Sequence, residues 1–213
     1  MTVSASGSAS GPQRREEPVF AALPVEDTPA QLRLHERLVG AAERDGLLDV
    51  AYRTLETPVG SLLLAATEEG LVRVAYDVQD HDAALADLAG RVSPRVLRAP
   101  ARLEQAVRQI EEYFEGRRTS FELALDMRLT KGFRREVIAR LPSIGYGRTE
   151  SYAQVAEAAG NPRAVRAVGT ACATNPLPVV LPCHRVVRSD GSAGGYAGGA
   201  EAKRTLLALE GAA

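Results

Sequence analysis

The chain between residues 50 and 76 alternates short apolar runs with turn residues. The apolar runs Val50–Leu55, Ser61–Ala66 and Leu71–Tyr76 have the length of strands. The segments that separate them, Thr57–Gly60 and Glu68–Gly70, contain residue types typical of turns. The pattern therefore predicts a three-stranded meander.

Apolar residues at helical spacing flank this meander. They predict helices over residues 29–43, 81–91 and 100–114, and the last of these opens on a proline, a favourable first helical residue. The face of that helix expected to be buried carries Leu103, Val107, Ile110 and Phe114. Short strands flanked by helices indicate an α/β (α+β) domain over residues 29–125. Residues 1–28 offer little to bury and are predicted to form a disordered tail.

Residues 126–213 show a different, mostly helical pattern. Helical spacing predicts a helix over residues 132–141. Ser151 is a favourable N-cap for a short helix over residues 152–159, and after a Gly-containing break a proline restarts a helix over residues 162–171. Helix, turn and helix in this order predict a winged-helix-like domain with a helix-turn-helix. An ordinary helical hairpin in a small bundle is the alternative.

Charge is divided unevenly between the two halves. The chain has 26 basic and 27 acidic residues, but residues 1–127 contain 14 basic and 21 acidic ones, and residues 128–213 contain 12 and 6. The halves therefore carry −7 and +6, which indicates an anionic partner for the C-terminal half. The second helix of the predicted motif adds two arginines and three small residues that let a backbone come close to a surface: Arg163, Arg166, Ala167, Gly169 and Thr170.

Composition excludes several classes of protein. The two cysteines, Cys172 and Cys183, cannot form a disulfide framework, and three histidines with two cysteines form no metal-ligand cluster at a recognised spacing. No apolar run reaches the length of a membrane span, and the N-terminus lacks the order of a signal peptide. We therefore expect a cytoplasmic protein without a metal. We expect Cys172 to be a small packing residue.

Cys183 is the strongest candidate for a reactive residue. It precedes His184 and Arg185, whose charges would favour the nucleophilic thiolate. His184 is the candidate base, although adjacent residues of an extended chain point to opposite sides. A direct Cys–His bond therefore requires a turn, and otherwise a water would bridge the two. Asp190 and Glu210 are both candidates for the carboxylate that orients the base.

A glycine-rich segment follows the candidate nucleophile. It is not a phosphate-binding loop, because no Gly-Lys-Ser/Thr sequence follows. Five glycines surround Tyr196 and predict a tight pocket wall in which the ring faces an aromatic ligand: Gly191, Gly194, Gly195, Gly198 and Gly199. A flexible surface loop is the alternative.

Together these motifs resemble those of the O6-alkylguanine-DNA alkyltransferases, also called methylated-DNA–protein-cysteine methyltransferases. The resemblance runs from Phe133 to Glu210 with matching order and spacing. Its motifs are Ser151–Gln154, Gly160–Pro162, Arg166–Gly169, Asn175–Pro176, Pro182–Val186, Gly195–Gly199 and Leu206–Gly211. Residues 50–115 resemble the family's variable N-terminal domain more weakly, and residues 1–45 lie outside the pattern.

The resemblance implies a DNA-repair protein in which each molecule acts once. It would bind duplex DNA through the minor groove, flip out an alkylated guanine and transfer the alkyl group irreversibly to Cys183. O4-alkylthymine is a further implied substrate. The expected partner is double-stranded DNA carrying alkylated guanine, bound by a monomer without a cofactor, and the N-terminal domain is expected to pack against the catalytic one.

The resemblance also assigns roles to individual residues. Catalytic roles are implied for Cys183 as nucleophile, His184 as a base acting through water, Glu210 as its orienting carboxylate, Asn175 as the brace of the preceding turn and Tyr152 as the residue that helps rotate the nucleotide. DNA contact is implied for Arg166 as the residue that enters the vacated stack, with Tyr152, Arg163, Ala167, Gly169 and Thr170 around it. The implied substrate pocket consists of Tyr196, Ala197, Gly198, Pro178, Gly194 and Val186.

Two other classes of protein remain open at this point. A non-catalytic alkyl-damage recognition protein, or a helix-turn-helix DNA-binding protein, would bind DNA without reacting. A cysteine hydrolase would need a distant histidine, but His35 and His81 lie in polar helical contexts. Weighing the protein after incubation with methylated DNA separates these classes.

Overall fold

The computed structural model describes residues 29–212, so the predicted disordered tail lies outside the described residues. The first helix, α1 (Pro29–Arg44), confirms the predicted one. The residues from Leu38 onward form one unit, whereas the start of α1 belongs to another. The unit that begins at Leu38 contains every candidate site residue.

The predicted meander is present as β1 (Val50–Thr57), β2 (Gly60–Thr67) and β3 (Gly70–Tyr76), which pair in antiparallel fashion. The sequence missed a fourth strand, β4 (Val96–Arg98), which pairs parallel to β1 and gives the sheet order β3-β2-β1-β4. A three-residue strand carries too little periodicity to be recognised, because its pairing with residues far away in the sequence defines it.

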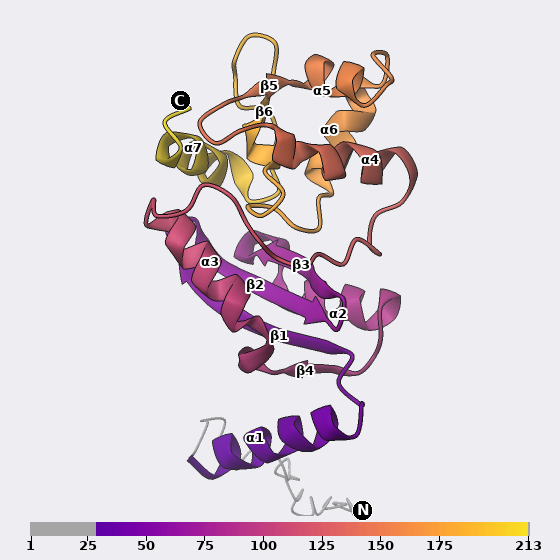
Figure 1. Cartoon of the computed structure of the whole chain (residues 1–213), viewed down its shortest axis with the longest axis vertical. Helices are drawn as coiled ribbons and strands as arrows, with labels where there is room; N and C mark the ends of the chain where they lie inside the picture. The colour runs from indigo at the N-terminus through magenta and orange to yellow at the C-terminus, as the bar shows by residue number, and fades with distance from the viewer. Residues whose placement is uncertain (1–28, 213) are drawn as a thin grey trace, which may run out of the picture. The chain divides into compact units, whose positions relative to one another are not determined.

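Both faces of the sheet are covered, as the continuous apolar run of β2 requires (Figure 1). Leu62 and Leu64 pack on the side of α3 (Glu104–Phe114), whereas Leu63 packs with Ala84 of α2 (His81–Arg91). Residues two apart on a strand share a face, so successive leucines of one strand contact different helices.

The structure corrects two details of the predicted helix over residues 100–114. Pro100–Leu103 form a separate 3-10 turn, η2, and α3 begins only at Glu104. The apolar face is also rotated, because Tyr113 is completely buried whereas Phe114 is half-buried. Positions three and four residues beyond Ile110 both lie near one face of a helix, so spacing alone does not decide between them.

The C-terminal half is built mainly from helices. Its elements are α4 (Gly132–Arg140), η3 (Leu141–Ser143), β5 (Glu150–Ser151), α5 (Tyr152–Ala158), α6 (Val165–Ala173), η4 (Cys183–Arg185), β6 (Val186–Val187) and α7 (Gly199–Leu209). The helix-turn-helix is α5–α6. The predicted start at Pro162 is wrong, because residues 162–163 form a turn and α6 begins at Val165.

Ser151 caps α5 as its sequence predicts. Its hydroxyl oxygen accepts from Gln154 N at 3.2 Å, and Gln154 Oε1 accepts in return from Ser151 N at 2.7 Å. This capping box satisfies two backbone donors at the helix start. The local sequence therefore fixes where the helix-turn-helix begins.

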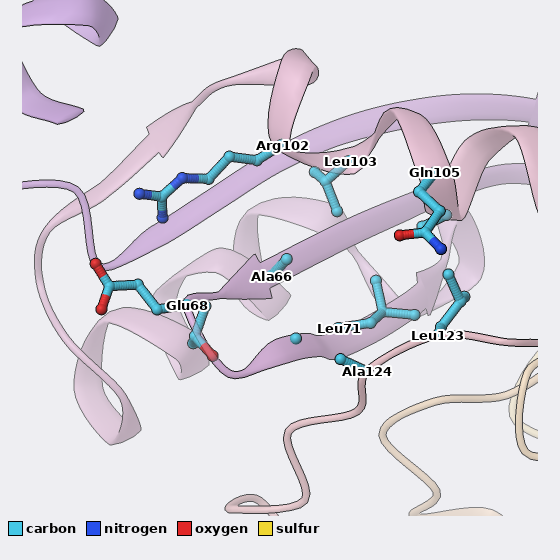
Figure 2. Close-up of a pocket in the computed structure, with 11 residues that line it drawn as sticks. Ala66, Glu68, Leu71, Arg102, Leu103, Gln105, Leu123 and Ala124 are labelled. Atoms are coloured by element: carbon cyan, nitrogen blue, oxygen red, sulfur yellow. The ribbon is translucent and has the colours of Figure 1, made fainter.

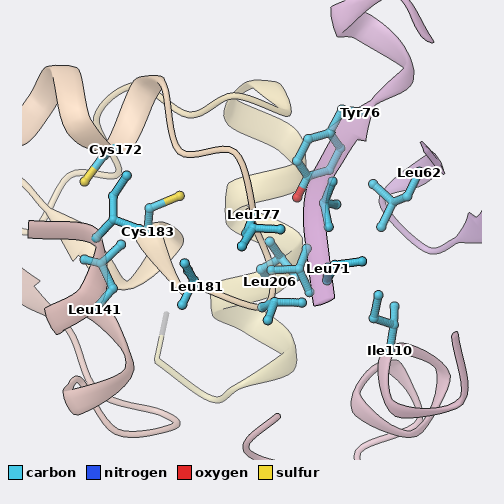
Figure 3. Packing of buried hydrophobic residues seen from close by; sticks show 14 of the residues in the cluster. Leu62, Leu71, Tyr76, Ile110, Leu141, Cys172, Leu177, Leu181, Cys183 and Leu206 are labelled. Atoms are coloured by element: carbon cyan, nitrogen blue, oxygen red, sulfur yellow. The ribbon is translucent and has the colours of Figure 1, made fainter. Parts of the chain in front are cut away.

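One hydrophobic cluster extends from the sheet into the C-terminal half. Leu62, Tyr76 and Ile110 belong to the same buried cluster as Leu177 and Leu206 (Figure 3). The predicted domain boundary near residue 125 stays a prediction, and no gap in the buried core marks it.

Candidate active site

The short turn η4 places Cys183 at the end of a tightly braced loop. Asn175 braces this loop from inside: its Nδ2 donates to Leu181 O at 2.8 Å, and its Oδ1 accepts from Leu177 N at 3.0 Å. The same Nδ2 lies 3.2 Å from Cys183 Sγ. Asn175 therefore connects the turn and the thiol through one buried amide.

Cys183 is almost completely buried, with 1% of its surface exposed. Burial raises the pKa of its thiol to about 11, against the opposing effects of the Asn175 hydrogen bond and the Lys203 charge. The sequence-based expectation that His184 and Arg185 favour the thiolate is therefore not met. The thiol is protonated at neutral pH, and its reaction requires a route for the proton.

His184 and Glu210 form a buried, hydrogen-bonded pair. His184 Nε2 lies 2.9 Å from Glu210 Oε1, and both side chains are buried. Burial lowers the pKa of His184 below its usual 6.5, although Glu210 opposes this effect. Burial alone would raise the pKa of Glu210, but hydrogen bonds from His184, Arg185 and Tyr113 lower it to about 2. A carboxylate is present beside a neutral imidazole at pH 7.

This charge state assigns the tautomer of His184. An ionised carboxylate only accepts hydrogen bonds, so Nε2 carries the proton that points to Glu210. The other ring nitrogen, Nδ1, is buried and has no hydrogen-bond partner among residues 29–212. Nδ1 is therefore the nitrogen able to accept a proton.

The structure decides between the two candidate carboxylates. Asp190 is exposed and accepts from Ser192 N at 2.9 Å, whereas Glu210 contacts the imidazole. Cys183 and His184 do share a turn, η4, yet within residues 29–212 the polar contact of the thiol is with Asn175 and no hydrogen bond joins it to His184. The sequence left open a direct bond between Cys183 and His184 or a water that bridges them, and the geometry favours the bridging water.

Arg185 is part of the same cluster. Its Nε and Nη2 each lie 2.9 Å from a different oxygen of Glu210, and its Nη1 donates to Ile144 O at 2.5 Å. A guanidinium that binds a carboxylate through two parallel hydrogen bonds holds it in one orientation. The charge of Arg185 is thus directed at Glu210 and not at the thiol.

Tyr196 lies at the centre of the glycine-rich loop, half-buried. Its hydroxyl lies 2.9 Å from that of Tyr76 on β3, and the two rings meet edge to face with centroids 5.7 Å apart. A Cβ at Gly198 would lie 2.7 Å from the Tyr76 ring, and one at Gly194 would lie 2.8 Å from the Tyr152 hydroxyl. The glycines therefore allow two tyrosines to approach the loop backbone closely.

The predicted DNA-facing residues lie on the surface. Arg163 precedes α6, and both it and Arg166 on that helix are exposed, as are Ala167 and Thr170, whereas Gly169 is half-buried. Tyr152, the first residue of α5, is half-buried, and Lys203 Nζ lies 5.9 Å from the centre of its ring. The second cysteine, Cys172, is buried on α6, which agrees with the predicted packing role.

The remaining pocket residues lie on two segments. Pro178 and Val186 are buried on either side of Cys183, whereas Ala197 and Gly194 are half-buried in the loop with Tyr196. The structure therefore joins Asn175 to Cys183 and His184 to Glu210 through hydrogen bonds, and the turn η4 links the two pairs. It places the loop residues near them through the edge-to-face contact of His184 and Tyr196, whose centroids are 6.3 Å apart.

A separate cavity of about 400 Å³ lies in the N-terminal half (Figure 2). Arg102, Gln105 and Glu68 contribute its polar groups, and Leu71 and Leu103 part of its apolar wall. None of the predicted site residues lines it. This cavity therefore lies apart from the candidate active site.

Within the described residues, no group of three or more His, Cys, Asp and Glu side chains could hold a metal ion. In the same part of the chain, no helix combines the length and apolar character needed to cross a membrane.

Together, the fold and the site define a protein that combines a helix-turn-helix with a buried cysteine served by a histidine–glutamate pair. Residues 132–212 match the family model for the DNA binding domain of 6-O-methylguanine DNA methyltransferase, and residues 50–127 match that for its ribonuclease-like domain. The chain belongs to the methylated-DNA–protein-cysteine methyltransferase family.

Individual relatives agree with this assignment over most of their length. A methylated-DNA–protein-cysteine methyltransferase of Mycolicibacterium paratuberculosis is 38% identical over 161 residues, which cover 76% of this chain and 92% of the relative. The constitutive enzyme of Bacillus subtilis is 39% identical, with 75% and 94% covered. The crystal structure of Mycobacterium tuberculosis OGT in complex with DNA matches with a TM-score of 0.67 at 37% identity, covering 76% of this chain and 92% of that one.

No sequence motif predicted that Tyr76 and Tyr113 contact residues of the candidate active site. Both belong to the N-terminal half, yet Tyr76 contacts Tyr196 and Tyr113 donates to Glu210 Oε1 at 2.7 Å. One available indication was the presence of a hydroxyl on the buried face of α3, where apolar residues would suffice for packing, because a buried tyrosine hydroxyl needs a hydrogen-bond partner.

Proposed function

We propose that this protein repairs DNA by transferring the alkyl group of O6-alkylguanine in duplex DNA to Cys183, with O4-alkylthymine as a second substrate. The observation that carries the proposal is the buried thiol of Cys183 held by Asn175 beside the His184–Glu210 pair. In a chain of this family with a helix-turn-helix, that arrangement supports nucleophilic transfer to a cysteine and not hydrolysis.

The proton of the thiol leaves through His184. A bridging water passes it from Cys183 to the free Nδ1, while Glu210 stabilises the imidazolium through Nε2. The resulting thiolate attacks the alkyl carbon, a C–S bond forms, and the bond from that carbon to guanine O6 breaks. The electron pair of the broken bond stays on guanine, which takes up the proton as it leaves.

The buried position of the thiol requires the damaged base to leave the duplex. Cys183 is 1% exposed and cannot reach an atom inside stacked DNA, so the nucleotide must be rotated into the protein. Arg166, exposed on α6, enters the vacated stack, and Tyr152 helps to rotate the nucleotide and bonds the departing guanine. The exposed residues around Arg166 contact the backbone: Arg163, Ala167 and Thr170, with Gly169 allowing close approach.

The extruded guanine occupies the loop side of the site. Tyr196 offers the flat face, the backbone of Ala197 and Gly198 contacts the guanine oxygen, and Pro178, Gly194 and Val186 leave room for the alkyl group. The thioether product is stable, so each molecule acts once and needs no cofactor. We also propose that the protein works in the cytoplasm as a monomer; a light-scattering mass of twice the chain would contradict the monomer.

Mass spectrometry of the protein after incubation with an O6-methylguanine duplex tests this function. We expect one methyl group per molecule on the peptide that contains Cys183, and none in Cys183→Ser. The matched control is Cys172→Ala, which removes the other buried thiol and still gains one methyl. An unchanged mass with DNA binding retained would indicate a non-catalytic recognition protein, and more than one guanine repaired per molecule would contradict single turnover.

A further inference from the structure

A tyrosine from the N-terminal half reaches the proton-accepting pair of the C-terminal half. Tyr113, near the end of α3, is completely buried. Its hydroxyl donates to Glu210 Oε1 at 2.7 Å and lies 3.5 Å from His184 Nε2. The two residues that share this short bond are 97 positions apart in the sequence.

The hydroxyl shares one carboxylate oxygen with the imidazole. Glu210 Oε1 accepts from Tyr113, from His184 Nε2 at 2.9 Å and from Arg185 Nη2 at 2.9 Å. Glu210 Oε2 accepts from Arg185 Nε at 2.9 Å and from Gly147 N at 3.2 Å. Tyr113 thus supplies a hydroxyl donor at the same carboxylate oxygen that the imidazole contacts.

The ring of Tyr113 is fixed by aromatic neighbours. Phe114, Phe121 and Tyr146 surround it, with ring centroids 5.4, 5.4 and 6.2 Å away. Burial raises the pKa of Tyr113, so the hydroxyl keeps its proton and acts as a donor to the carboxylate. A ring held by packing brings this donor to one place, which is the property a positioning residue needs.

We propose that Tyr113 is a positioning residue for alkyl transfer: its hydroxyl holds Glu210 Oε1 in line with His184 Nε2 and so supports the hydrogen bond that leaves Nδ1 free to accept a proton. This inference rests on the proposed function of His184 and Glu210. It assigns to the N-terminal half a part in the reaction, in place of packing alone.

The hydroxyl also affects how strongly the pair attracts a proton. The charged or titratable groups facing His184 and Glu210 include Arg185, Lys203, Tyr113 and Tyr146, together with Tyr196, whose ring lies edge to face with that of His184. Arg185 and Lys203 both act to lower the pKa of His184 and stay in place when the Tyr113 hydroxyl is removed. Without that hydroxyl, Glu210 Oε1 loses one donor and stabilises imidazolium more strongly, so the pKa of His184 rises.

Single-turnover kinetics of full-length Tyr113→Phe on a methylated duplex test the proposal, because phenylalanine keeps the ring and removes only the hydroxyl. We expect the transfer rate constant to fall about 10-fold, as for other residues that orient a reacting group indirectly, with DNA affinity unchanged. The acid-side midpoint of the pH–rate profile should move upward. The matched control is Tyr52→Phe, which removes a tyrosine hydroxyl of β1 that makes no contact with the site, and its profile should equal that of the wild type.

Nitrogen-15 NMR of the His184 ring provides a readout that does not need turnover. The wild type and Tyr113→Phe should both show a proton on Nε2 and a free Nδ1 at high pH, and the pH at which Nδ1 gains a proton should be higher in Tyr113→Phe. An unchanged pH–rate profile and an unchanged Nδ1 titration midpoint in Tyr113→Phe, even with a lower rate, would overturn the positioning role. If the wild type gains no methyl group, the proposed function fails, whereas the Nδ1 titration still tests Tyr113.

Discussion

Arg185 and Arg166 belong to the same basic half of the chain, but the structure uses their charges in different ways. Arg185 is buried and bound to Glu210 through two nitrogens, whereas Arg166 is exposed on α6. Lys203 is also buried, and its Nζ donates to Val186 O at 2.6 Å. The count of +6 therefore overstates the charge available to DNA, because part of it stabilises the interior of the protein.

The same comparison predicts where mutations affect folding. Removing one partner of a buried ion pair leaves the other partner without compensation, which is costly in an environment of low dielectric constant. Removing an exposed arginine leaves nothing unsatisfied, because water solvates its former neighbours. The free energy of unfolding should therefore separate the cluster around Glu210 from the surface of α6.

The largest loss in the free energy of unfolding is expected for Glu210→Gln. The substitution keeps the shape but removes the charge that Arg185 and His184 face, so the free energy of unfolding should fall by about 3–5 kcal/mol. Urea denaturation at pH 7 measures this difference. A loss below about 1 kcal/mol, the range of exposed ion pairs, would contradict the assigned burial of the pair.

The pH dependence of this loss gives a second check of the same variant. The pKa of Glu210 is about 2 in the folded protein and has a reference value of 4.5. A carboxyl group whose pKa is lowered by folding stabilises the folded state. This stabilisation is fully present when the pH lies above the reference pKa, and it is lost as the pH falls toward the pKa of the folded state. The stability difference between wild type and Glu210→Gln should therefore be constant above about pH 5 and narrow below pH 4.5. A difference that does not change with pH would point to lost packing.

A smaller loss is expected for Asn175→Ala, in which the buried group is polar but uncharged. The substitution leaves Leu181 O and Leu177 N without their partner, and unsatisfied buried groups cost about 1–3 kcal/mol. The same denaturation experiment measures the loss, and Ser143→Ala, which removes an exposed hydroxyl bonded only to Arg140 O, is the control. A loss as large as that of Glu210→Gln would show that charge is not what distinguishes the buried cluster.

The sequence predicted the parts of the site that depend on local order. Ser151 caps α5 as expected, and Asn175, for which the resemblance implies a bracing role, bonds within the loop that precedes Cys183. The contact of Tyr113 with Glu210 could not be predicted in this way. It depends on how α3 packs against the C-terminal half, and no periodicity within either segment carries that information.

The same limit explains the errors in the fold. β4 exists because Val96 pairs with Val50. Tyr113 is more deeply buried than Phe114 because α3 packs against the C-terminal half, where Tyr113 contacts the ring of Tyr146. The α6 helix begins at Val165 and not at Pro162, since Gly160 and the residues after it form a longer turn. The expectation that Arg185 favours the thiolate of Cys183 failed for a related reason, because neighbours in the sequence need not interact in space.

The smallest effect on folding is expected for Arg166→Ala, and it tests the exposed side of the comparison. Because Arg166 is exposed, the free energy of unfolding should stay within about 0.5 kcal/mol of the wild type. Repair of duplex DNA should nevertheless slow far more than the reaction with free O6-methylguanine, because only the duplex has a stack to fill. The matched control is Arg204→Ala on α7, another exposed arginine that lies outside the helix-turn-helix. Parallel losses on duplex and free base would assign Arg166 to chemistry or folding, whereas equal behaviour of the two arginine variants would reduce its role to that of general positive charge.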